Sequence, residues 1–267
     1  MNRIAFALLF TLVLSPAVHG AIPSTLTVKA AAIYPEGIAF NQKTSEFYVS
    51  SLRKGTIGVI SQKGVYSEFA VDENLVSTVG MLVDAPRNRL LACVSDPGVG
   101  LKTDPKHKER IAWVVAYDLT TKKKVGGVAL GKLKKGKHFC NDLTVDAEGN
   151  IYVTDSFSPI IYKIKGYTPT IFVESDKFVG AGFNLNGIVY HSDGYLLVAK
   201  YNDGTIWKIS IKDPADITQV TLPAAYSGLD GLVLISKNEI AGIQNAKENK
   251  IHKFTTTDGW KTATVKT

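Results

Sequence analysis

A repeat of about 44 residues is the feature of this sequence that most limits its fold. Five segments align without gaps over their first seven positions, and their opening residues are spaced 43, 62, 45 and 44 positions apart. The segments are EGIAFNQ at Glu36, VGMLVDA at Val79, NDLTVDA at Asn141, NGIVYHS at Asn186 and DGLVLIS at Asp230. Repeats of about 40–50 residues at a fixed phase are typical of stacked or circular repeat architectures.

Each repeat has the pattern of three or four short strands. A second strand-like segment follows each opening, from EFYVSS at 46–51 to EIAGIQN at 239–245, and third segments run from GTIGVIS at 55–61 to KIHKFTT at 250–256. The intervening turns are rich in Asp, Asn, Gly and Lys, as hairpins require, and amphipathic helices of useful length are absent. A sandwich would not explain the fixed phase of the openings. The pattern therefore predicts an all-β fold, a β-propeller.

The N-terminus has the pattern of a secretory signal. Arg3 is followed by an apolar run from Ile4 to Leu14, then Ser15-Pro16 and small residues. This run is too short to span a bilayer, which favours a cleaved signal over an uncleaved anchor. We therefore expect a signal peptide at 1–20, a propeller domain at 21–267, no membrane anchor, and a secreted or periplasmic protein. The sequence does not predict its oligomeric state.

The charge distribution argues against a nucleic-acid partner. The formal net charge is +7, and the basic excess is concentrated in Lys102–Arg110 and Lys122–Lys137, both within the longer second interval. No aromatic residues interleave with these runs as a stacking surface would need, so they are interpreted as solvated loops. Nucleophile-elbow and P-loop patterns are missing, which gives no support to a serine hydrolase or a nucleotide enzyme.

Two cysteines, Cys93 and Cys140, would meet an oxidising compartment if the signal is used. They could form a disulfide, or Cys93 could be a buried thiol and Cys140 an unpaired one. The sequence leaves both alternatives open, because it does not give the separation of the two residues.

The opening residues of the repeats are the candidate site. Four of the five carry oxygen, namely Glu36, Asn141, Asn186 and Asp230. In a propeller the innermost strands line the channel, so these side chains should converge there. An oxygen-only set suits a hard cation, Ca²⁺ before Mg²⁺ or Mn²⁺. The competing interpretation is that they are turn residues that cap local backbone groups.

At these residues the sequence resembles the family of senescence marker protein, gluconolactonase and luciferin-regenerating enzyme, within the calcium-dependent phosphotriesterase-like superfamily. The resemblance is carried by YPEGIAF (34–40), NDLTVDAEGNIYVTDSFSP (141–159), LNGIVYHSDGYLLVAKYNDGTIWKI (185–209), LDGLVL (229–234) and TTDGW (256–260). It implies a six-bladed propeller whose channel holds a divalent cation, usually Ca²⁺, with Mg²⁺, Mn²⁺ or Zn²⁺ as alternatives.

The resemblance also implies roles for the opening residues. Glu36, Asn186 and Asp230 would be the metal ligands, Asn141 would contact water or substrate, and Asp230 would be the catalytic base that activates water. Sugar-lactone hydrolysing members have an arginine two residues before the Asn141 position, where this chain has Phe139. This departure argues against polyol recognition, although the nearby Lys137 and His138 could substitute as partners of the substrate.

Two functions follow from this reading. The first is a secreted metal-dependent hydrolase of a small lactone or ester, in which the cation stabilises the developing oxyanion. The alternative is a non-catalytic secreted propeller that binds a small molecule or protein at the channel mouth, with Ca²⁺ in a structural role. Propellers have many functions, so the fold does not decide between them.

Chain length conflicts with a ring of six. A sixth opening would fall about 44 residues after Asp230, beyond Thr267. Residues 26–33 and 260–266 could supply at most strands of an incomplete last blade. We therefore expect a fold of the six-bladed type with five repeat cores and an incomplete last blade. It would be either a C-terminally truncated ring or a ring that closes with five blades.

Overall fold

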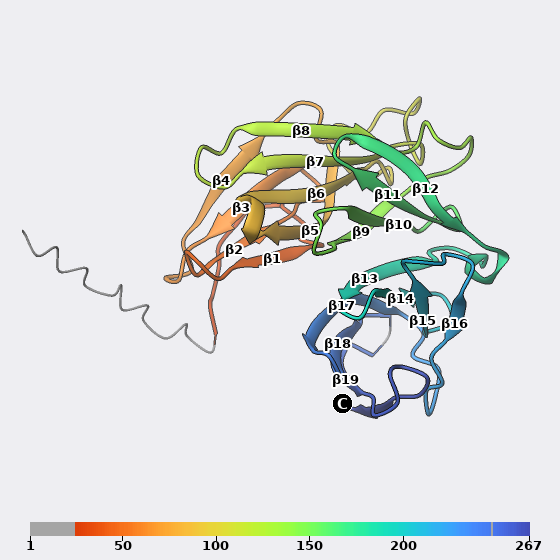
Figure 1. The fold of residues 1–267 in the computed structure, drawn as a ribbon. Helices are drawn as coiled ribbons and strands as arrows, with labels where there is room; N and C mark the ends of the chain where they lie inside the picture. Colours follow the sequence, from red (N-terminus) through yellow and green to blue (C-terminus); the bar gives the residue numbers. More distant parts are fainter. Residues whose placement is uncertain (1–24, 247) are drawn as a thin grey trace, which may run out of the picture.

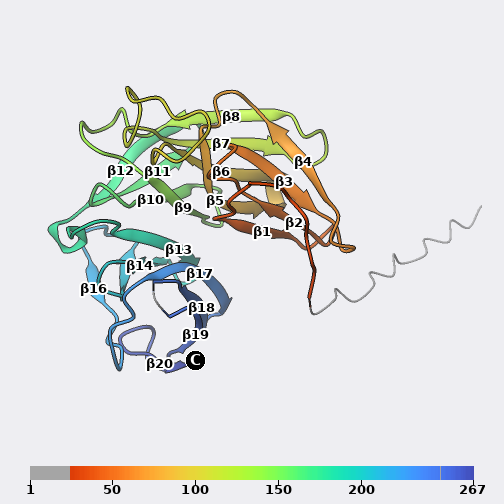
Figure 2. The same ribbon diagram turned by 180° about the vertical axis from the view of Figure 1, so that it is seen from behind.

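The computed structural model describes residues 25–246 and 248–267, and these form five four-stranded antiparallel sheets (Figures 1 and 2). Each sheet is numbered here as a blade, and its strands are paired in chain order. Blade 1 comprises β1 (Ile38–Asn41), β2 (Glu46–Val49), β3 (Thr56–Ile60) and β4 (Tyr66–Val71). Blade 2 comprises β5 (Ser77–Asp84), β6 (Arg89–Ser95), β7 (Ala112–Asp118) and β8 (Lys124–Ala129).

The remaining three blades repeat this order. Blade 3 comprises β9 (Cys140–Val145), β10 (Ile151–Asp155), β11 (Ile160–Lys165) and β12 (Thr168–Glu174). Blade 4 comprises β13 (Leu185–His191), β14 (Tyr195–Lys200), β15 (Thr205–Ser210) and β16 (Ile217–Gln219). Blade 5 comprises β17 (Leu229–Ser236), β18 (Glu239–Gln244), β19 (Lys250–Thr255) and β20 (Thr264–Lys266). Two short 3₁₀ helices, Ala85–Arg87 and Asp176–Phe178, lie in connections.

The first strand of each blade is the innermost one. β1 contacts β5, β5 contacts β9, β9 contacts β13 and β13 contacts β17, so the blades follow one another around a central axis. The chain is therefore a β-propeller, as the repeat predicts. Each first strand begins at the same end of its blade, and we call this end of the molecule the site face.

Four apolar clusters lie between successive blades and hold the ring together. Val79 of blade 2 packs with Val153 of blade 3, for example, and Leu196 of blade 4 packs with Tyr152 of blade 3. Equivalent clusters join blades 1 and 2 and blades 4 and 5. Burial of this kind contributes about 25 cal/mol per Å² of apolar surface, so each blade-to-blade junction stabilises the ring.

The five expected repeat cores are all present, but residues 260–266 do not belong to an incomplete sixth blade, because β20 is part of blade 5. Blade 5 has all four strands, because residues 256–263 turn the chain back and β20 pairs with β19 from Lys253–Lys266 to Thr255–Thr264. The buried Trp260 anchors this turn, and its indole N–H donates to the Lys237 carbonyl at 3.0 Å. Residues 26–33 form no strand; Val28, Ala30 and Ile33 pack against the outside of blade 1 instead.

The extra length of the second repeat lies on the site face. Residues 96–111 connect β6 to β7, and residues 130–139 connect β8 to β9. The first basic run and residues 132–137 of the second fall in these segments, which the strand directions place at the end where the first strands begin. Lys122–Lys124 lie instead at the turn between β7 and β8, at the opposite end of blade 2. The predicted signal peptide at 1–20 lies outside the described residues. Among residues 25–246 and 248–267, no helix is both long and apolar enough to cross a bilayer.

Candidate functional site

A β-bulge marks the opening of the repeat in four of the five blades. In blade 2 the first strand advances from Thr78 to Met81 while its partner moves only from Val94 to Ala92. The same one-residue excess lies between Cys140 and Leu143, between Leu185 and Ile188, and between Leu229 and Leu232. Bulges re-aim side chains and are over-represented beside active sites. The opening residues Val79, Asn141, Asn186 and Asp230 all lie within them.

The residue that follows the opening residue of a repeat determines how closely neighbouring blades approach each other. A Cβ atom on Gly37 would lie 2.3 Å from the Val79 carbonyl oxygen, and one on Gly80 would lie 2.4 Å from the Asn141 carbonyl oxygen. Gly187 has the same relationship, at 2.5 Å, to the carbonyl oxygen of Asp230. Glycine is required at these three positions because the backbone of blades 1, 2 and 4 presses against the opening residue of the next blade.

Three carboxyl groups at the channel lie close enough together to affect one another's pKa. Enclosure by the surrounding blades raises the pKa of Glu36 well above its ordinary value, and the nearby Asp230 and Asp142 carboxylates raise it further, although the Glu36 side chain remains accessible to solvent. Burial raises the pKa of Asp142 to about 7, with a contribution from Asp230, and burial also raises the pKa of Asp230. These three residues come from blades 1, 3 and 5.

Asparagine side chains surround Asp230. Asn186 and Asn245 both hydrogen-bond to its carboxylate. Burial raises the pKa of Asp230, and these two hydrogen bonds offset only part of that increase. The Tyr201 hydroxyl donates to Asn245 Oδ1 at 2.9 Å. The predicted ligands Glu36, Asn186 and Asp230 are thus brought together at one end of the channel.

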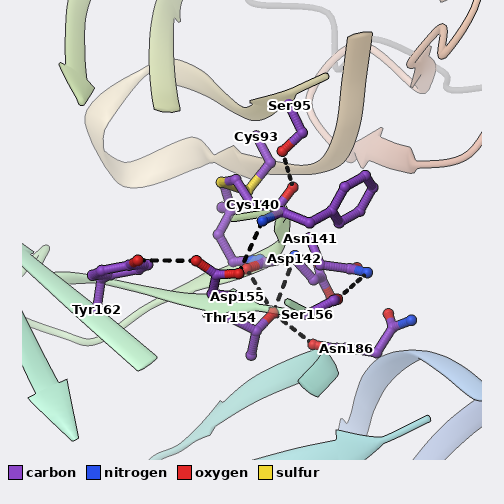
Figure 3. The surroundings of a disulfide bond; sticks show 12 residues. Cys93, Ser95, Cys140, Asn141, Asp142, Thr154, Asp155, Ser156, Tyr162 and Asn186 are labelled. Atoms are coloured by element: carbon purple, nitrogen blue, oxygen red, sulfur yellow. Dashed lines mark hydrogen bonds between the residues drawn. A yellow bond between two sulfur atoms is a disulfide. The ribbon is translucent and has the colours of Figure 1, made fainter. Parts of the chain in front are cut away.

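Asn141 lies in the same ring but is held differently. Its side chain is buried, and its amide Nδ2 donates to Ser156 Oγ at 2.8 Å (Figure 3). Ser156 Oγ in turn donates to the Leu185 carbonyl of the next blade. The side-chain amide N–H of Asn141 therefore stabilises the fold. The side-chain amide oxygen of Asn141 is the atom that could bind a ligand.

Asp142 was missed by sequence reasoning. It occupies the position that is glycine in the other four repeats, so the pattern marks it only as a place for a small residue. In the structure its Oδ1 accepts from the Leu143 N–H at 2.9 Å and its Oδ2 accepts from the Ile188 N–H at 3.3 Å. Asp142 therefore links β9 to β13 two residues beyond Asn186 and adds a carboxylate to the site.

His138 is not available to a substrate. It is buried, its Nδ1 lies 2.7 Å from Asp155 Oδ2, and its Nε2 lies 2.8 Å from the Lys134 carbonyl oxygen. The Asp155 carboxylate also accepts from the Tyr162 hydroxyl at 2.9 Å (Figure 3) and from the Phe139 N–H at 2.9 Å. This network fixes the segment that leads into Asn141. His138 and Asp155 thus position the site rather than face it.

Aromatic side chains surround Phe139, the position for which Lys137 and His138 were considered above as substitute partners of a polyol. Phe139 is buried and lies 5.4 Å from Phe157 and 5.3 Å from Phe183, measured between ring centroids. Tyr201 lies 6.3 Å from Phe183 and carries the hydroxyl that reaches Asn245. Lys137 does not replace the missing arginine, because it pairs with Glu109. The surroundings of the site are therefore aromatic on this side.

A disulfide joins blades 2 and 3 beside the site. Cys93 in β6 and Cys140 in β9 are bonded, with their Cα atoms 5.4 Å apart (Figure 3). Cys140 directly precedes Asn141, and its carbonyl accepts from Ser95 Oγ at 3.2 Å. Of the two alternatives left open by the sequence, the structure has the disulfide.

The expected ligands offer oxygen atoms, the kind of donor that a hard divalent cation binds. Within residues 25–246 and 248–267, no three His, Cys, Asp or Glu side chains converge closely enough to form a metal site by themselves. The expected ligand set of Glu36, Asn186 and Asp230 differs from such a cluster, because it combines two carboxylates with the amide oxygen of an asparagine. No lysine, arginine or histidine of these residues forms an ion pair with Glu36, Asp142 or Asp230. Three carboxyls without a counter-charge are a suitable environment for a cation.

Comparison with known proteins identifies the fold. No family model matches the chain, and no curated protein matches it. Among solved structures, it is similar to the major allergen Mala s 1 of Malassezia sympodialis, with a TM-score of 0.72 and 18% identity over 92% of this chain and 82% of that one. It is also similar to the gluconolactonase XC5397 of Xanthomonas campestris, with a TM-score of 0.61 and 17% identity over 88% and 75%.

A third similar structure is a streptogramin B lyase, with a TM-score of 0.58 and 14% identity over 87% of this chain and 72% of that one. The class of protein is therefore the β-propeller, a fold that lactonases and lyases share. The allergen and the gluconolactonase are six-bladed, whereas five blades are described here. At these identities the similarity extends to the fold alone.

Proposed function

We propose that this chain is a divalent-cation-dependent hydrolase of lactones or related esters. The observation that carries the proposal is that Asn186 and Asp230 lie in bulges of innermost strands and Glu36 lies just before the innermost strand of blade 1, at the same end of the channel, and that among the described residues neither carboxylate has a basic partner. Like charges that are held together raise one another's pKa, so a cation bound there would relieve the repulsion. The shared fold with a gluconolactonase is consistent with this chemistry.

Glu36, Asn186 and Asp230 are the residues that would hold the cation, and Ca²⁺ suits their oxygens best. When bound, such a cation polarises a carbonyl oxygen and lowers the pKa of water. Asp230 accepts the proton of the attacking water. Asn245 and Asn186 keep the Asp230 carboxylate in place by donating to it. Asp142 fixes the backbone of β13 through the Ile188 N–H and thereby positions Asn186.

The walls of the site favour an apolar acyl group. Phe139, two residues before Asn141, contacts Phe157 and Phe183, and Phe183 contacts Tyr201, whose hydroxyl reaches Asn245 beside Asp230. Such side chains bury apolar surface and offer few hydrogen bonds to a polyol. We therefore expect alkyl lactones and aryl esters to be better substrates than sugar lactones.

The test is a hydrolysis assay of the purified chain on alkyl lactones, sugar lactones, aryl esters and phosphotriesters, with Ca²⁺ and with chelator. Asp230→Asn should reduce the rate on the best substrate by about 100-fold or more, because a ligand and proton acceptor is lost. Asp193→Asn, on the opposite end of blade 4, is the matched control and should leave the rate unchanged. Equal rates for Asp230→Asn and Asp193→Asn, or equal rates with and without chelator, would contradict the proposal.

A further inference from the structure

The two connections that lengthen the second repeat, residues 96–111 and 130–139, enclose a hollow on the site face. Its volume is about 550 Å³, within the range of about 300–1,000 Å³ that is usual for small-ligand pockets. None of the expected metal ligands lines it, so it is separate from the candidate metal site. The lining residues are Pro105, Lys108, Glu109, Arg110, Gly136 and Lys137.

Hydrogen bonds hold the two connections in place beside this hollow. Asp96 follows β6 and is buried, and its carboxylate accepts from the Thr103 hydroxyl at 2.8 Å and from the Asp104 N–H at 3.2 Å. The Asp96 carbonyl accepts from the Glu109 N–H at 2.7 Å, and the Glu109 carbonyl accepts from the His138 N–H at 2.8 Å. The two connections are therefore bonded to each other, and the hollow between them is a built part of the fold.

The lining of the hollow has an excess of positive charge. Three of its side chains are basic, and the only acidic one is Glu109. Glu109 pairs with Lys137, and this hydrogen-bonded pair, with a contribution from the charge of Lys108, holds the pKa of Glu109 below its ordinary value. Two positive charges of the lining are therefore left without a balancing acid.

Lys108 and Arg110 are the basic side chains that a ligand can reach. Both are exposed to solvent. In the part of the chain that the structure describes, neither side chain forms a hydrogen bond or an ion pair. An arginine fork beside an ammonium group suits an oxyanion with several oxygen atoms, because the fork binds two of them and the ammonium a third.

We propose that this hollow, called the basic pocket from here on, binds a phosphomonoester carried by a small soluble molecule. A phosphomonoester is close to doubly charged at neutral pH, and its charge balances the two unpaired positive charges. A monocarboxylate would leave one of them unbalanced. The phosphate group would fill only part of the basic pocket, so the remaining space has room for the esterified group.

The basic pocket lies near the mouth of the channel. Lys137 precedes Asn141 by four residues, so their Cα atoms are at most about 14 Å apart. Lys106, Lys132 and Lys135 belong to the same two connections, and none of them forms an ion pair with another described residue. Clustered charge of one sign raises the local concentration of oppositely charged ligands. The site face as a whole therefore attracts anions toward the basic pocket.

Isothermal titration of the full, chelator-treated chain with phenyl phosphate tests the proposal. We expect the wild-type chain to bind phenyl phosphate and to bind acetate at least several-fold more weakly. The double variant Lys108→Gln/Arg110→Gln should bind phenyl phosphate at least about tenfold more weakly, because charge-assisted hydrogen bonds are lost. Lys123→Gln/Lys165→Gln is the matched control, since it removes the same charge from exposed residues at the opposite end of the molecule. It should bind as the wild-type chain does.

A third variant should strengthen binding, which a damaged fold would not do. Glu109→Gln removes the acid of the lining and frees Lys137, so it should tighten phenyl phosphate binding several-fold. The proposal is overturned if the wild-type chain does not bind phenyl phosphate, if the two double variants bind alike, or if Glu109→Gln weakens binding.

A lipid source of the same phosphate chemistry needs a separate arm. Phosphatidylcholine vesicles with and without phosphatidic acid, which is a phosphomonoester lipid, are sedimented with the wild-type chain. Binding to phosphatidic acid vesicles without binding of phenyl phosphate would overturn the proposal of a soluble ligand. None of these measurements depends on Ca²⁺ or on hydrolysis, so their outcome is independent of the proposed hydrolase activity.

Discussion

Gly187 lies against the backbone of Asp230, and a Cβ atom added to Gly187 would be 2.5 Å from the Asp230 carbonyl oxygen. This relationship links two features of the molecule, because the glycine that allows blades 4 and 5 to pack also fixes the strand that carries the site carboxylate. Close packing of the ring and placement of the site therefore depend on the same contact.

The first prediction concerns this glycine. Gly187→Ala should destabilise the chain by about 1–3 kcal/mol, because backbone atoms of blade 5 must shift to admit the methyl group. Gly231→Ala is the matched control, since nothing lies within 4 Å of its added Cβ atom, and it should be nearly neutral. Urea unfolding of the two variants measures the difference, and equal losses would show that the blades do not press together at Gly187.

The second prediction concerns the disulfide. Cys93 and Cys140 are 47 residues apart, and closing such a loop removes entropy worth about 4 kcal/mol from the unfolded chain. Replacing both cysteines by alanine should lower the free energy of unfolding by about 2–4 kcal/mol. Reducing agent should lower the melting temperature of the wild-type chain and have no effect on the double variant. A wild-type chain that is indifferent to reductant would contradict the disulfide.

The third prediction concerns pH and His138. Its hydrogen bond to Asp155 raises the pKa of His138 against the opposing effect of burial, so the folded chain holds this proton more tightly than the unfolded chain does. Its contribution to stability is present below the unfolded pKa of about 6.5 and is lost as the pH rises through the higher folded pKa. The pKa of His252 is lowered by burial, so its contribution has the opposite sign.

Comparison with a variant isolates the His138 effect. His138→Ala should lower the free energy of unfolding by about 1–3 kcal/mol at pH 6, because Asp155 and the Lys134 carbonyl lose a partner. The gap between wild type and variant should narrow as the pH rises above 6.5. Denaturant unfolding at a series of pH values checks this, and a gap that is constant from pH 6 to pH 8.5 would exclude a raised pKa.

The repeat phase made much of the architecture predictable. The opening residues recur at nearly constant spacing, so equivalent positions of successive repeats fall on the innermost strands of successive blades. That argument brought Glu36, Asn186 and Asp230 to one end of the channel, where the structure has them. It succeeded because alternation and turn residues are local signals that the sequence carries directly.

Other features depend on contacts that the pattern does not show. Asp142 stands at a glycine position, and its importance comes from the Ile188 N–H of the next blade. The bulges add one residue to a strand without changing the kind of residues in it, so they cannot be recognised from the alternation of apolar and polar residues. The fourth strand of blade 5 has only three residues, Thr264–Lys266, and it is recognisable only through its pairing with β19.

The central claim is that the opening residues form a cation site, and calcium titration tests it most directly. Isothermal titration of the chelator-treated chain with Ca²⁺ should show one site with a Kd of about 10⁻⁶–10⁻³ M. Saturating Ca²⁺, at about 100 times this Kd, should add about 2.7 kcal/mol to the free energy of unfolding. Both effects should vanish in Glu36→Gln and Asp230→Asn. They should persist in Asp193→Asn and in Glu68→Gln, a change at an exposed residue of β4, the outer strand of blade 1. Binding that survives Glu36→Gln and Asp230→Asn, or no binding by the wild-type chain, would contradict the account.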